Sequence, residues 1–208
     1  LSRELSRLSV IENSEQESRN LVRTFEVVYW LIGIVIGASV IILAPLIAKY
    51  WINSANISTE IIEQTLLIMG MLLAFQWPRA IYIGGLEGLQ RQVLYNVIKT
   101  LSMLARHIGA VLILTFISPS ILYFFYWQSV VALITTIVLA VYLWRSLPKS
   151  NGRSKFDKNL FIKNWKFVSG VMGISLGTVL LTQIDKVILS KMLTLEVFSY
   201  YMLATTVA

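Results

Sequence analysis

Polar side chains recur along one apolar stretch of this 208-residue sequence. Two amides, two cations and a small residue follow one another at steps of three and four, which places them on one face of a helix. These residues are Gln92, Asn96, Lys99, Arg106 and Ala110, with Met103 on the same face and His107 beside it. Such a face could attract an anionic ligand, because Arg donates two parallel hydrogen bonds and Lys supplies a point charge.

Arg106 lies near the middle of this stretch, where a charged side chain is costly unless it faces a protein interior or a wet cavity. We predict that Arg106, Lys99 and Asn96 line such a cavity and bind substrate. An alternative remains for each cation. Lys99 could extend its ammonium group to the membrane surface, and Arg106 could be paired permanently with a carboxylate.

A second polar row runs along another apolar stretch, with small residues on the roughly opposite face. The polar row is Ser175, Thr178, Thr182 and Asp185, and the small residues are Gly170, Gly173 and Gly177. Glycines on one face allow close helix packing. Asp185 and Lys186 diverge by about 100° on a helix, so each needs a partner on another element. Two interhelical ion pairs are one interpretation. In the other, Asp185 holds a coupling ion and Lys186 contacts substrate.

The composition explains which elements carry these residues. The sequence is 56% hydrophobic and only 14% charged, whereas a soluble domain is about one quarter charged. It is therefore expected to be an all-helical protein that crosses the membrane several times. It has no Cys and a single His, so no disulfide framework, metal site or cofactor is expected. The net charge of +7 is attributed to segments beside the spans rather than to nucleic-acid binding.

Apolar runs and basic segments together predict the topology. Residues 145–166 carry seven Lys and Arg side chains against Asp157, and such a segment stays in the cytoplasm because cations are hard to translocate. The segment also contains Pro148 and Gly152, which indicate a flexible connection. The predicted spans are residues 27–48, 61–83, 93–117, 121–144 and 165–189, with a sixth beginning near residue 197.

Several local motifs refine this topology. Residues 1–13 predict an amphipathic helix on the inner membrane surface. Ser14 and Glu17 match a capping box. Gly33 and Gly37 match a helix-packing motif, and Glu26 is expected at the inner membrane interface.

Pro78 and the glycines that follow it predict how the second span ends. Pro78 should kink the helix, because it removes one backbone donor and frees the carbonyl group of Ala74. Residues 84–92, which contain three glycines, are expected to form a turn on the cytoplasmic side.

Four stretches together resemble the polysaccharide flippases of the MOP transporter superfamily, which translocate O-antigen and other repeat units. They are LSRELSR at 1–7, GLEGLQRQ at 85–92, QIDKVILSK at 183–191 and YYMLA at 200–204. Their order and spacing extend the resemblance over essentially the whole chain. One departure is Ser199, which stands where such proteins commonly have Gly before the tyrosine pair.

The resemblance implies twelve to fourteen helices in two lobes, of which this chain would hold about six. Because it begins at Leu1 and ends in an apolar run, we interpret it as an internal piece. Residues 1–148 would belong to the amino-terminal lobe, 149–164 to a basic cytoplasmic loop, and 165–208 to the carboxy-terminal lobe. The resemblance further implies a cationic cavity for a polyprenyl-diphosphate-linked glycan, and alternating access of the two lobes.

These expectations define a multi-pass flippase of the inner membrane that is not an enzyme. The expected partners are a lipid-linked oligosaccharide and the bilayer, with other polysaccharide-assembly proteins as further candidates. One alternative is a multidrug exporter of the same superfamily, which would need acidic sites for organic cations. Another is a membrane-embedded glycan polymerase or ligase, which would need large polar outer loops with catalytic residues. The predicted outer loops are short, and no catalytic constellation is found.

Overall fold

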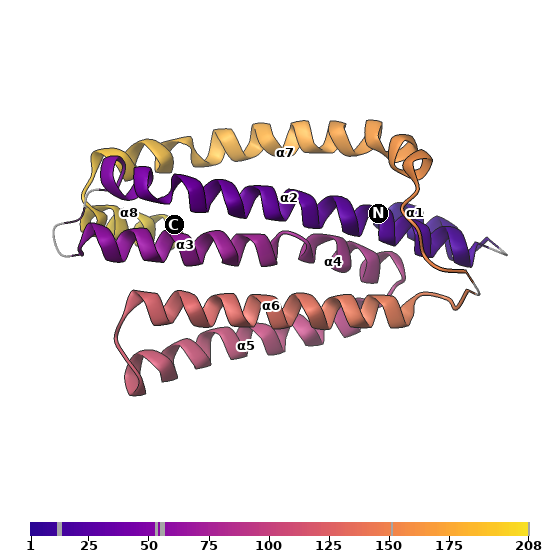
Figure 1. Ribbon diagram of the computed structural model, residues 1–208, viewed down its shortest axis with the longest axis horizontal. Coiled ribbons are helices and arrows are strands. Elements are labelled where there is room, and N and C mark those ends of the chain that lie inside the picture. The colour runs from indigo at the N-terminus through magenta and orange to yellow at the C-terminus, as the bar shows by residue number, and fades with distance from the viewer. Residues whose placement is uncertain (12–13, 53, 55–56, 151, 208) are drawn as a thin grey trace.

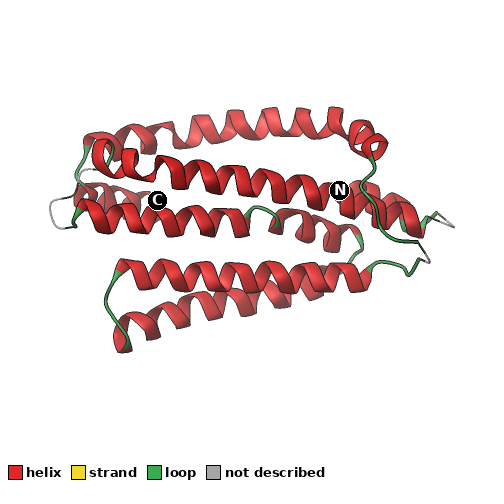
Figure 2. Ribbon diagram, in the orientation of Figure 1, coloured by secondary structure: helices red, strands yellow, loops and turns green. Residues whose placement is uncertain are grey.

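The fold is described from a computed structural model. The structure describes residues 1–11, 14–52, 54, 57–150 and 152–207, without the side chains of residues 163–176, 179, 206 and 207. Within these ranges all regular structure is helical, as Figure 2 shows. The helices are α1 (Ser2–Leu8), α2 (Glu15–Tyr50), α3 (Thr59–Gln76), α4 (Arg79–Gly88), α5 (Gln92–Phe116), α6 (Ile121–Ser146), α7 (Lys158–Met192) and α8 (Leu195–Val207).

The long helices lie side by side in the order α7, α2, α3, α6 and α5, as Figure 1 shows. The helix α4 continues the line of α3, and the short α1 packs against α4 at the end of the bundle where the chain begins. Apolar side chains of α1, α2, α4, α5 and α6 form the main core. The core therefore lies toward the end of the bundle that holds α1 and α4.

Four stretches of the described chain are long and apolar enough to cross a bilayer. They are Glu15–Tyr50, Thr59–Gly88, Gln92–Phe116 and Ile121–Ser146. They confirm the first four predicted spans in kind and place, so the chain is a helical membrane protein. The chain also turns between α5 and α6 at the predicted tight turn, where the Ser120 hydroxyl caps α6 by accepting a bond from the Leu122 amide.

The predicted packing motif on α2 is confirmed. Gly33 and Gly37 are buried against α3. A Cβ atom at Gly37 would lie 2.7 Å from the Gly70 carbonyl oxygen, and one at Gly33 would lie 3.0 Å from the Ala74 carbonyl oxygen. Because these positions lack side chains, α2 and α3 approach each other backbone to backbone.

The kink predicted at Pro78 is a break between two helices. The helix α3 ends at Gln76, and α4 begins at Arg79 and continues to Gly88. The prediction of a turn over residues 84–92 is therefore wrong for its first half, and the turn is confined to Leu89, Gln90 and Arg91. Gln90 has a φ of 57° there. The glycines are tolerated within the helix because Gly85 and Gly88 lie where Leu143 and Ser2 approach closely.

The amino-terminal segment differs from its prediction in two ways. Leu5 and Leu8 of α1 are buried in the protein core, so this apolar face packs on protein rather than on lipid. Ser14 precedes α2 as expected, but its hydroxyl donates backward to the carbonyl groups of Leu8 and Ile11 instead of capping the helix. Farther along the chain, in α2, Glu26 is expected at the inner membrane interface, and the structure buries it inside the bundle with only 7% exposure.

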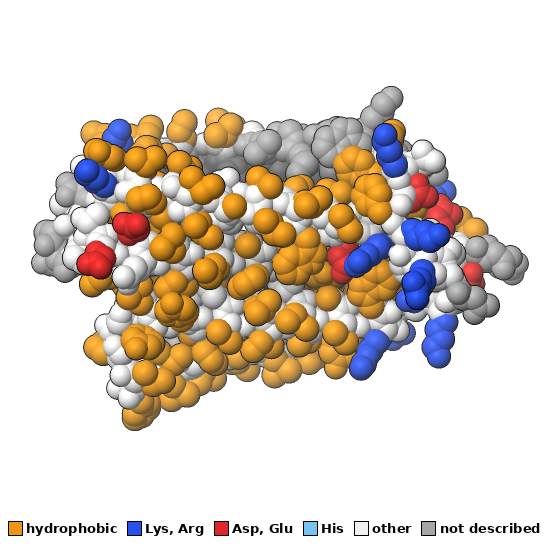
Figure 3. Space-filling view, viewed as in Figure 1, with side chains coloured by type: hydrophobic (Ala, Val, Ile, Leu, Met, Phe, Trp, Pro, Cys, Tyr) orange, Lys and Arg blue, Asp and Glu red, His pale blue; other side chains and the backbone are white. Residues whose placement is uncertain are grey.

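Lys and Arg side chains gather at the end of the bundle that holds α1 and the connection between α6 and α7, as Figure 3 shows. The middle of the face in view is largely hydrophobic. This distribution matches the basic segments that the sequence placed on one side of the membrane.

The connection between α6 and α7 lies along α2 and is not free. Gln16, Asn20 and Thr24, spaced four residues apart on α2, bond to its backbone. Gln16 Nε2 donates to the Arg153 carbonyl at 3.0 Å, Asn20 Oδ1 accepts from the Lys155 amide at 2.9 Å, and Thr24 Oγ1 accepts from the Asp157 amide at 2.9 Å. These bonds restrain the backbone at Arg153, Lys155 and Asp157. The flexible break expected from Pro148 to Gly152 stays a prediction.

This connection is also shorter than predicted. The Asp157 carboxylate accepts bonds from the amides of Asn159 and Leu160 and caps α7. The helix therefore begins at Lys158, inside the range assigned to the loop. The assignment of residues 1–148 and 165–208 to two lobes stays a prediction.

Candidate functional site

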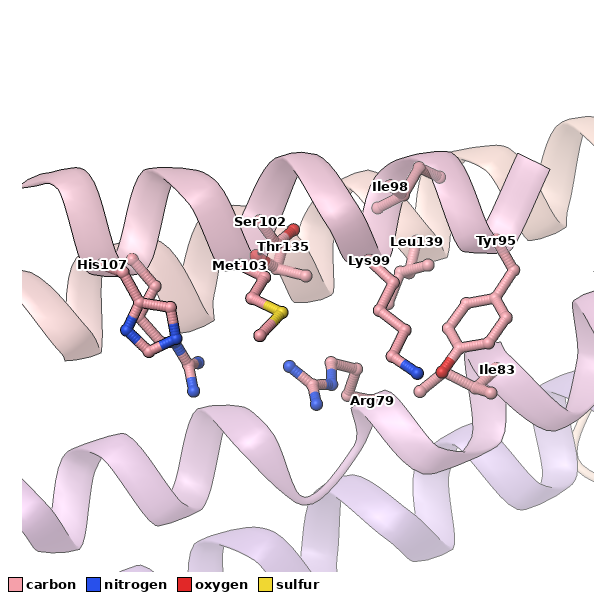
Figure 4. Close-up of a pocket in the computed structure, with 11 residues that line it drawn as sticks. Arg79, Ile83, Tyr95, Ile98, Lys99, Ser102, Met103, His107, Thr135 and Leu139 are labelled. Atoms are coloured by element: carbon pink, nitrogen blue, oxygen red, sulfur yellow. Dashed lines mark hydrogen bonds between the residues drawn. The ribbon is translucent and has the colours of Figure 1, made fainter. Parts of the chain in front are cut away.

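Three cations meet in one pocket between α4, α5 and α6. The pocket has a volume of about 240 Å³ and contains Arg79, Lys99 and Arg106, with His107 and Tyr95 as further polar groups. Apolar residues and two hydroxyls complete the wall: Ile83, Ile98, Met103, Leu139, Ser102 and Thr135. The side chains of Arg79 and Lys99 extend from facing helices into the same space, as Figure 4 shows.

The break between α3 and α4 brings Arg79 to this pocket. A regular helix would pair the Phe75 carbonyl with the Arg79 amide, and Pro78 prevents the helix from continuing. The Phe75 carbonyl oxygen instead accepts a 2.8 Å bond from the hydroxyl of Thr136 on α6. Hydroxyl side chains allow such breaks in membrane helices because they satisfy the freed backbone groups. Arg79 can therefore begin a new helix at the level where Lys99 and Arg106 face it.

Lys99 and Arg106 line the pocket because they lie on the same face of α5. Residues 95, 99, 102, 103 and 106 all line the pocket, which is the spacing of one helix face. Ser102 is fixed to α6, since its hydroxyl lies 3.0 Å from that of Thr135. The helices α5 and α6 thereby hold the two cations toward α4.

The pocket concentrates positive charge. Among the described residues, no carboxylate lies within salt-bridge distance of Arg79, Lys99 or Arg106. Like charges close together in a partly desolvated site raise the local potential, and an anion that enters it lowers the free energy. The pairing of Arg106 with a carboxylate, considered from the sequence, is not found within the described part of the chain.

The remaining predicted site residues lie elsewhere. Asn96 is exposed and does not line the pocket, although its neighbour Tyr95 does. Asp185 and Lys186 lie on α7, none of whose described side chains lines the pocket. Asp185 accepts a 2.5 Å hydrogen bond from the Tyr201 hydroxyl of α8, so its partner is a neutral donor rather than a cation.

The predicted packing face of the same helix is only partly described. Ser175, Gly170 and Gly173 lie outside the residues whose side chains are described. A Cβ atom at Gly177 would meet no atom within 4 Å, so this glycine packs against none of the described helices.

Arg79 is the cation of the pocket that the sequence did not single out. It directly follows Pro78, and its signal was that a basic residue stood next to a helix break inside an apolar span. Intramembrane breaks that expose backbone and cations commonly line binding cavities. His107, noted only as a neighbour of the polar face, also lines the pocket.

The fold and the pocket define a class: a helical membrane protein with a cationic pocket between helices that are long and apolar enough to cross a bilayer. A family model described as "Polysaccharide biosynthesis protein" matches residues 4–208, so the chain belongs to that family, which includes the flippases of the MOP superfamily. No curated protein and no solved structure matches the chain. The protein therefore has a role in polysaccharide synthesis or transport at a membrane.

Proposed function

We propose that this protein translocates a polyprenyl-diphosphate-linked oligosaccharide across the inner membrane by alternating access, as a transporter rather than an enzyme. The single observation that supports this most strongly is the convergence of Arg79, Lys99 and Arg106 in one pocket within the spans. An isolated anion in hydrocarbon is very costly, and cations held in a cavity remove much of that cost.

The residues suggest how the task is divided. The two guanidinium groups can each donate paired hydrogen bonds to phosphate oxygens, and the Lys99 ammonium adds charge without fixed geometry. The Tyr95 hydroxyl, the hydroxyls of Ser102 and Thr135, and His107 can bond to sugars or water. The lipid tail would remain in the bilayer, and movement of the lobes would change the side to which the pocket opens.

The pocket chemistry disfavours the two alternatives. An exporter of organic cations needs carboxylates where this pocket has Arg and Lys. A polymerase or ligase needs catalytic groups at the membrane surface, but the connection between α5 and α6 contains only residues 117–120. Lys186 and Asp185 remain proposed as substrate and coupling-ion contacts of the second lobe.

Reconstituted transport tests the proposal. The full-length protein would be placed in vesicles with a fluorescent oligosaccharide linked to polyprenyl diphosphate, and with a polyprenyl monophosphate counterpart. We expect Arg106→Ala to reduce diphosphate transport at least about tenfold, the loss that corresponds to roughly 1.4 kcal/mol, and Arg106→Lys to retain part of it. Arg91→Ala is the matched control, because Arg91 is an exposed cation outside the pocket.

Two results would contradict the proposal. Full transport by a normally abundant Arg106→Ala protein would remove this residue from the mechanism. Equal transport of the two lipids at every concentration would argue against recognition of a diphosphate. If Arg106 only supported the fold, Arg106→Ala would instead lower the amount of protein in the membrane.

A further inference from the structure

Glu26 of α2 is a buried carboxylate that joins three helices. Its Oε1 accepts a 2.8 Å hydrogen bond from the Tyr82 hydroxyl of α4 and a 3.2 Å bond from the Trp144 indole of α6. Its Oε2 accepts a 2.8 Å bond from Arg23 of α2. Both carboxylate oxygens therefore have donors, which is what a buried charge requires.

Tyr82 is the link between this carboxylate and α4. It is only 2% exposed, and its oxygen also accepts a 3.0 Å hydrogen bond from the Trp30 indole. The hydroxyl thus donates to one residue of α2 and accepts from another. A tyrosine whose hydroxyl both donates and accepts a hydrogen bond has little freedom to change position.

The position of α4 depends on such contacts because α4 is short and not continuous with α3. It has ten residues and is separated from α3 by the break at Pro78. Its carboxyl end is held separately, since the Ser6 hydroxyl of α1 donates a 2.8 Å bond to the Gly88 carbonyl. Toward the amino end of α4, Tyr82 makes the side-chain hydrogen bonds that join this helix to α2.

Tyr82 lies one helical turn after Arg79 and directly before Ile83. Arg79 and Ile83 both line the cationic pocket. A shift of Tyr82 would therefore move Arg79. We propose that Glu26 is a positioning residue that holds α4 through Tyr82 and so keeps the Arg79 guanidinium in the pocket. The consequence for transport rests on the proposed function, whereas the positioning itself does not.

Cross-linking tests the positioning without any transport. The 208 residues contain no Cys, so Arg79→Cys and Met103→Cys would place a pair of thiols on opposite walls of the pocket. In the full-length protein in vesicles, a short bismaleimide would join them when α4 is in place. We expect Glu26→Ala and Tyr82→Phe each to lower the rate of cross-linking between positions 79 and 103 about fivefold, the change expected when one hydrogen bond is lost. Glu26→Gln keeps an acceptor oxygen, so its cross-linking rate should lie between the rates of these variants and that of the parent.

Two controls separate this effect from general loosening. Ser102→Cys and Thr135→Cys join α5 to α6, where the hydroxyls are 3.0 Å apart, and this pair should cross-link equally in all backgrounds. Trp144→Phe removes a donor from the same carboxylate oxygen but none from α4, so it should leave the first pair unchanged. Unchanged rates for the first pair in both Glu26→Ala and Tyr82→Phe would overturn the proposal. So would equal losses in both pairs.

A double-mutant cycle tests the link to transport. Tyr82→Phe and Arg79→Ala should each raise the substrate concentration for half-maximal transport while the maximal rate changes less. Because both act through the same guanidinium, the double variant should resemble Arg79→Ala alone. Additive effects would overturn the coupling of Tyr82 to Arg79. If the parent protein moved no lipid diphosphate, the proposed function would fail while the cross-linking result still judged the positioning.

Discussion

The hydroxyl of Thr136, in the middle of α6, donates a 2.8 Å hydrogen bond to the carbonyl oxygen of Phe75 at the end of α3. The two residues are far apart in sequence, and the bond satisfies a backbone group that the break before Pro78 frees. Thr136 is only 1% exposed, so water does not replace it. The interruption that places Arg79 in the pocket is thus stabilised from another helix.

Removal of this hydroxyl should destabilise the protein. We expect Thr136→Val to lower the free energy of unfolding by about 1–3 kcal/mol, the cost of a buried unsatisfied polar group. Thr136→Ser keeps the hydroxyl and is the control. Thermal unfolding of the purified protein measures the difference, and identical melting temperatures for Thr136→Val and the parent would show that the Phe75 carbonyl finds another donor.

The approach of α2 to α3 should be sensitive to a single methyl group. Gly37→Ala would place Cβ 2.7 Å from the Gly70 carbonyl oxygen and 2.8 Å from the Ala74 Cβ, so we expect a destabilisation of about 1–3 kcal/mol. Gly84→Ala is the matched control, since a Cβ there meets no atom within 4 Å and Ala favours helix. The melting temperature should fall for Gly37→Ala and not for Gly84→Ala. A fall of the same size in both would contradict the packing argument.

The connection between α6 and α7 should become a protease site when its bonds to α2 are removed. Asn20→Ala deletes the acceptor of the Lys155 amide and also the Gln16 contact on α2. We expect faster trypsin cleavage at Arg153 and Lys155, because both are exposed and cleavage requires a mobile backbone. Glu17→Ala, an exposed change on the same helix, should leave the rate unchanged. Equal cleavage rates in the Asn20→Ala and Glu17→Ala proteins would mean that the α2 contacts do not restrain the connection.

Asp185 is expected to matter for transport or for folding, and Tyr201 distinguishes the two roles. Asp185→Asn keeps an oxygen that can accept the Tyr201 hydroxyl, whereas Tyr201→Phe removes the bond. A coupling role predicts that Asp185→Asn loses transport at normal abundance and Tyr201→Phe does not. A role in joining α7 to α8 predicts that Tyr201→Phe lowers abundance more. Normal abundance and transport in Asp185→Asn would leave neither role.

Thiol labelling in intact cells tests the orientation. The Lys and Arg asymmetry predicts that the α2–α3 and α5–α6 connections face outward and that the basic end faces the cytoplasm. Cysteines at the exposed positions Glu60 and Pro119 should therefore react with an impermeant reagent, and those at the exposed positions Arg91 and Lys149 should react only after permeabilisation. Reaction of the cysteine at position 149 in intact cells would contradict the whole predicted topology.

The sequence by itself determined where the spans lie and that Lys99 and Arg106 share one face of α5. Apolar runs of sufficient length predict helices wherever the chain lies in a membrane, because every backbone group must be paired within the segment. Steps of three and four place Lys99 and Arg106 on one face irrespective of what that face meets. The glycines of α2 likewise indicated close packing from the sequence alone, because the absence of a side chain is a property of the residue itself.

Only the tertiary structure decided which partners those faces meet. The burial of Glu26 depends on donors from α4 and α6, and the fixed connection after α6 depends on a polar row of α2 far away in the sequence. Asn96, on the predicted polar face, lies outside the pocket, while Arg79 enters it across a helix break. Side-chain periodicity specifies the direction in which a residue points from its own helix. What lies in that direction depends on packing between helices, which no local pattern records.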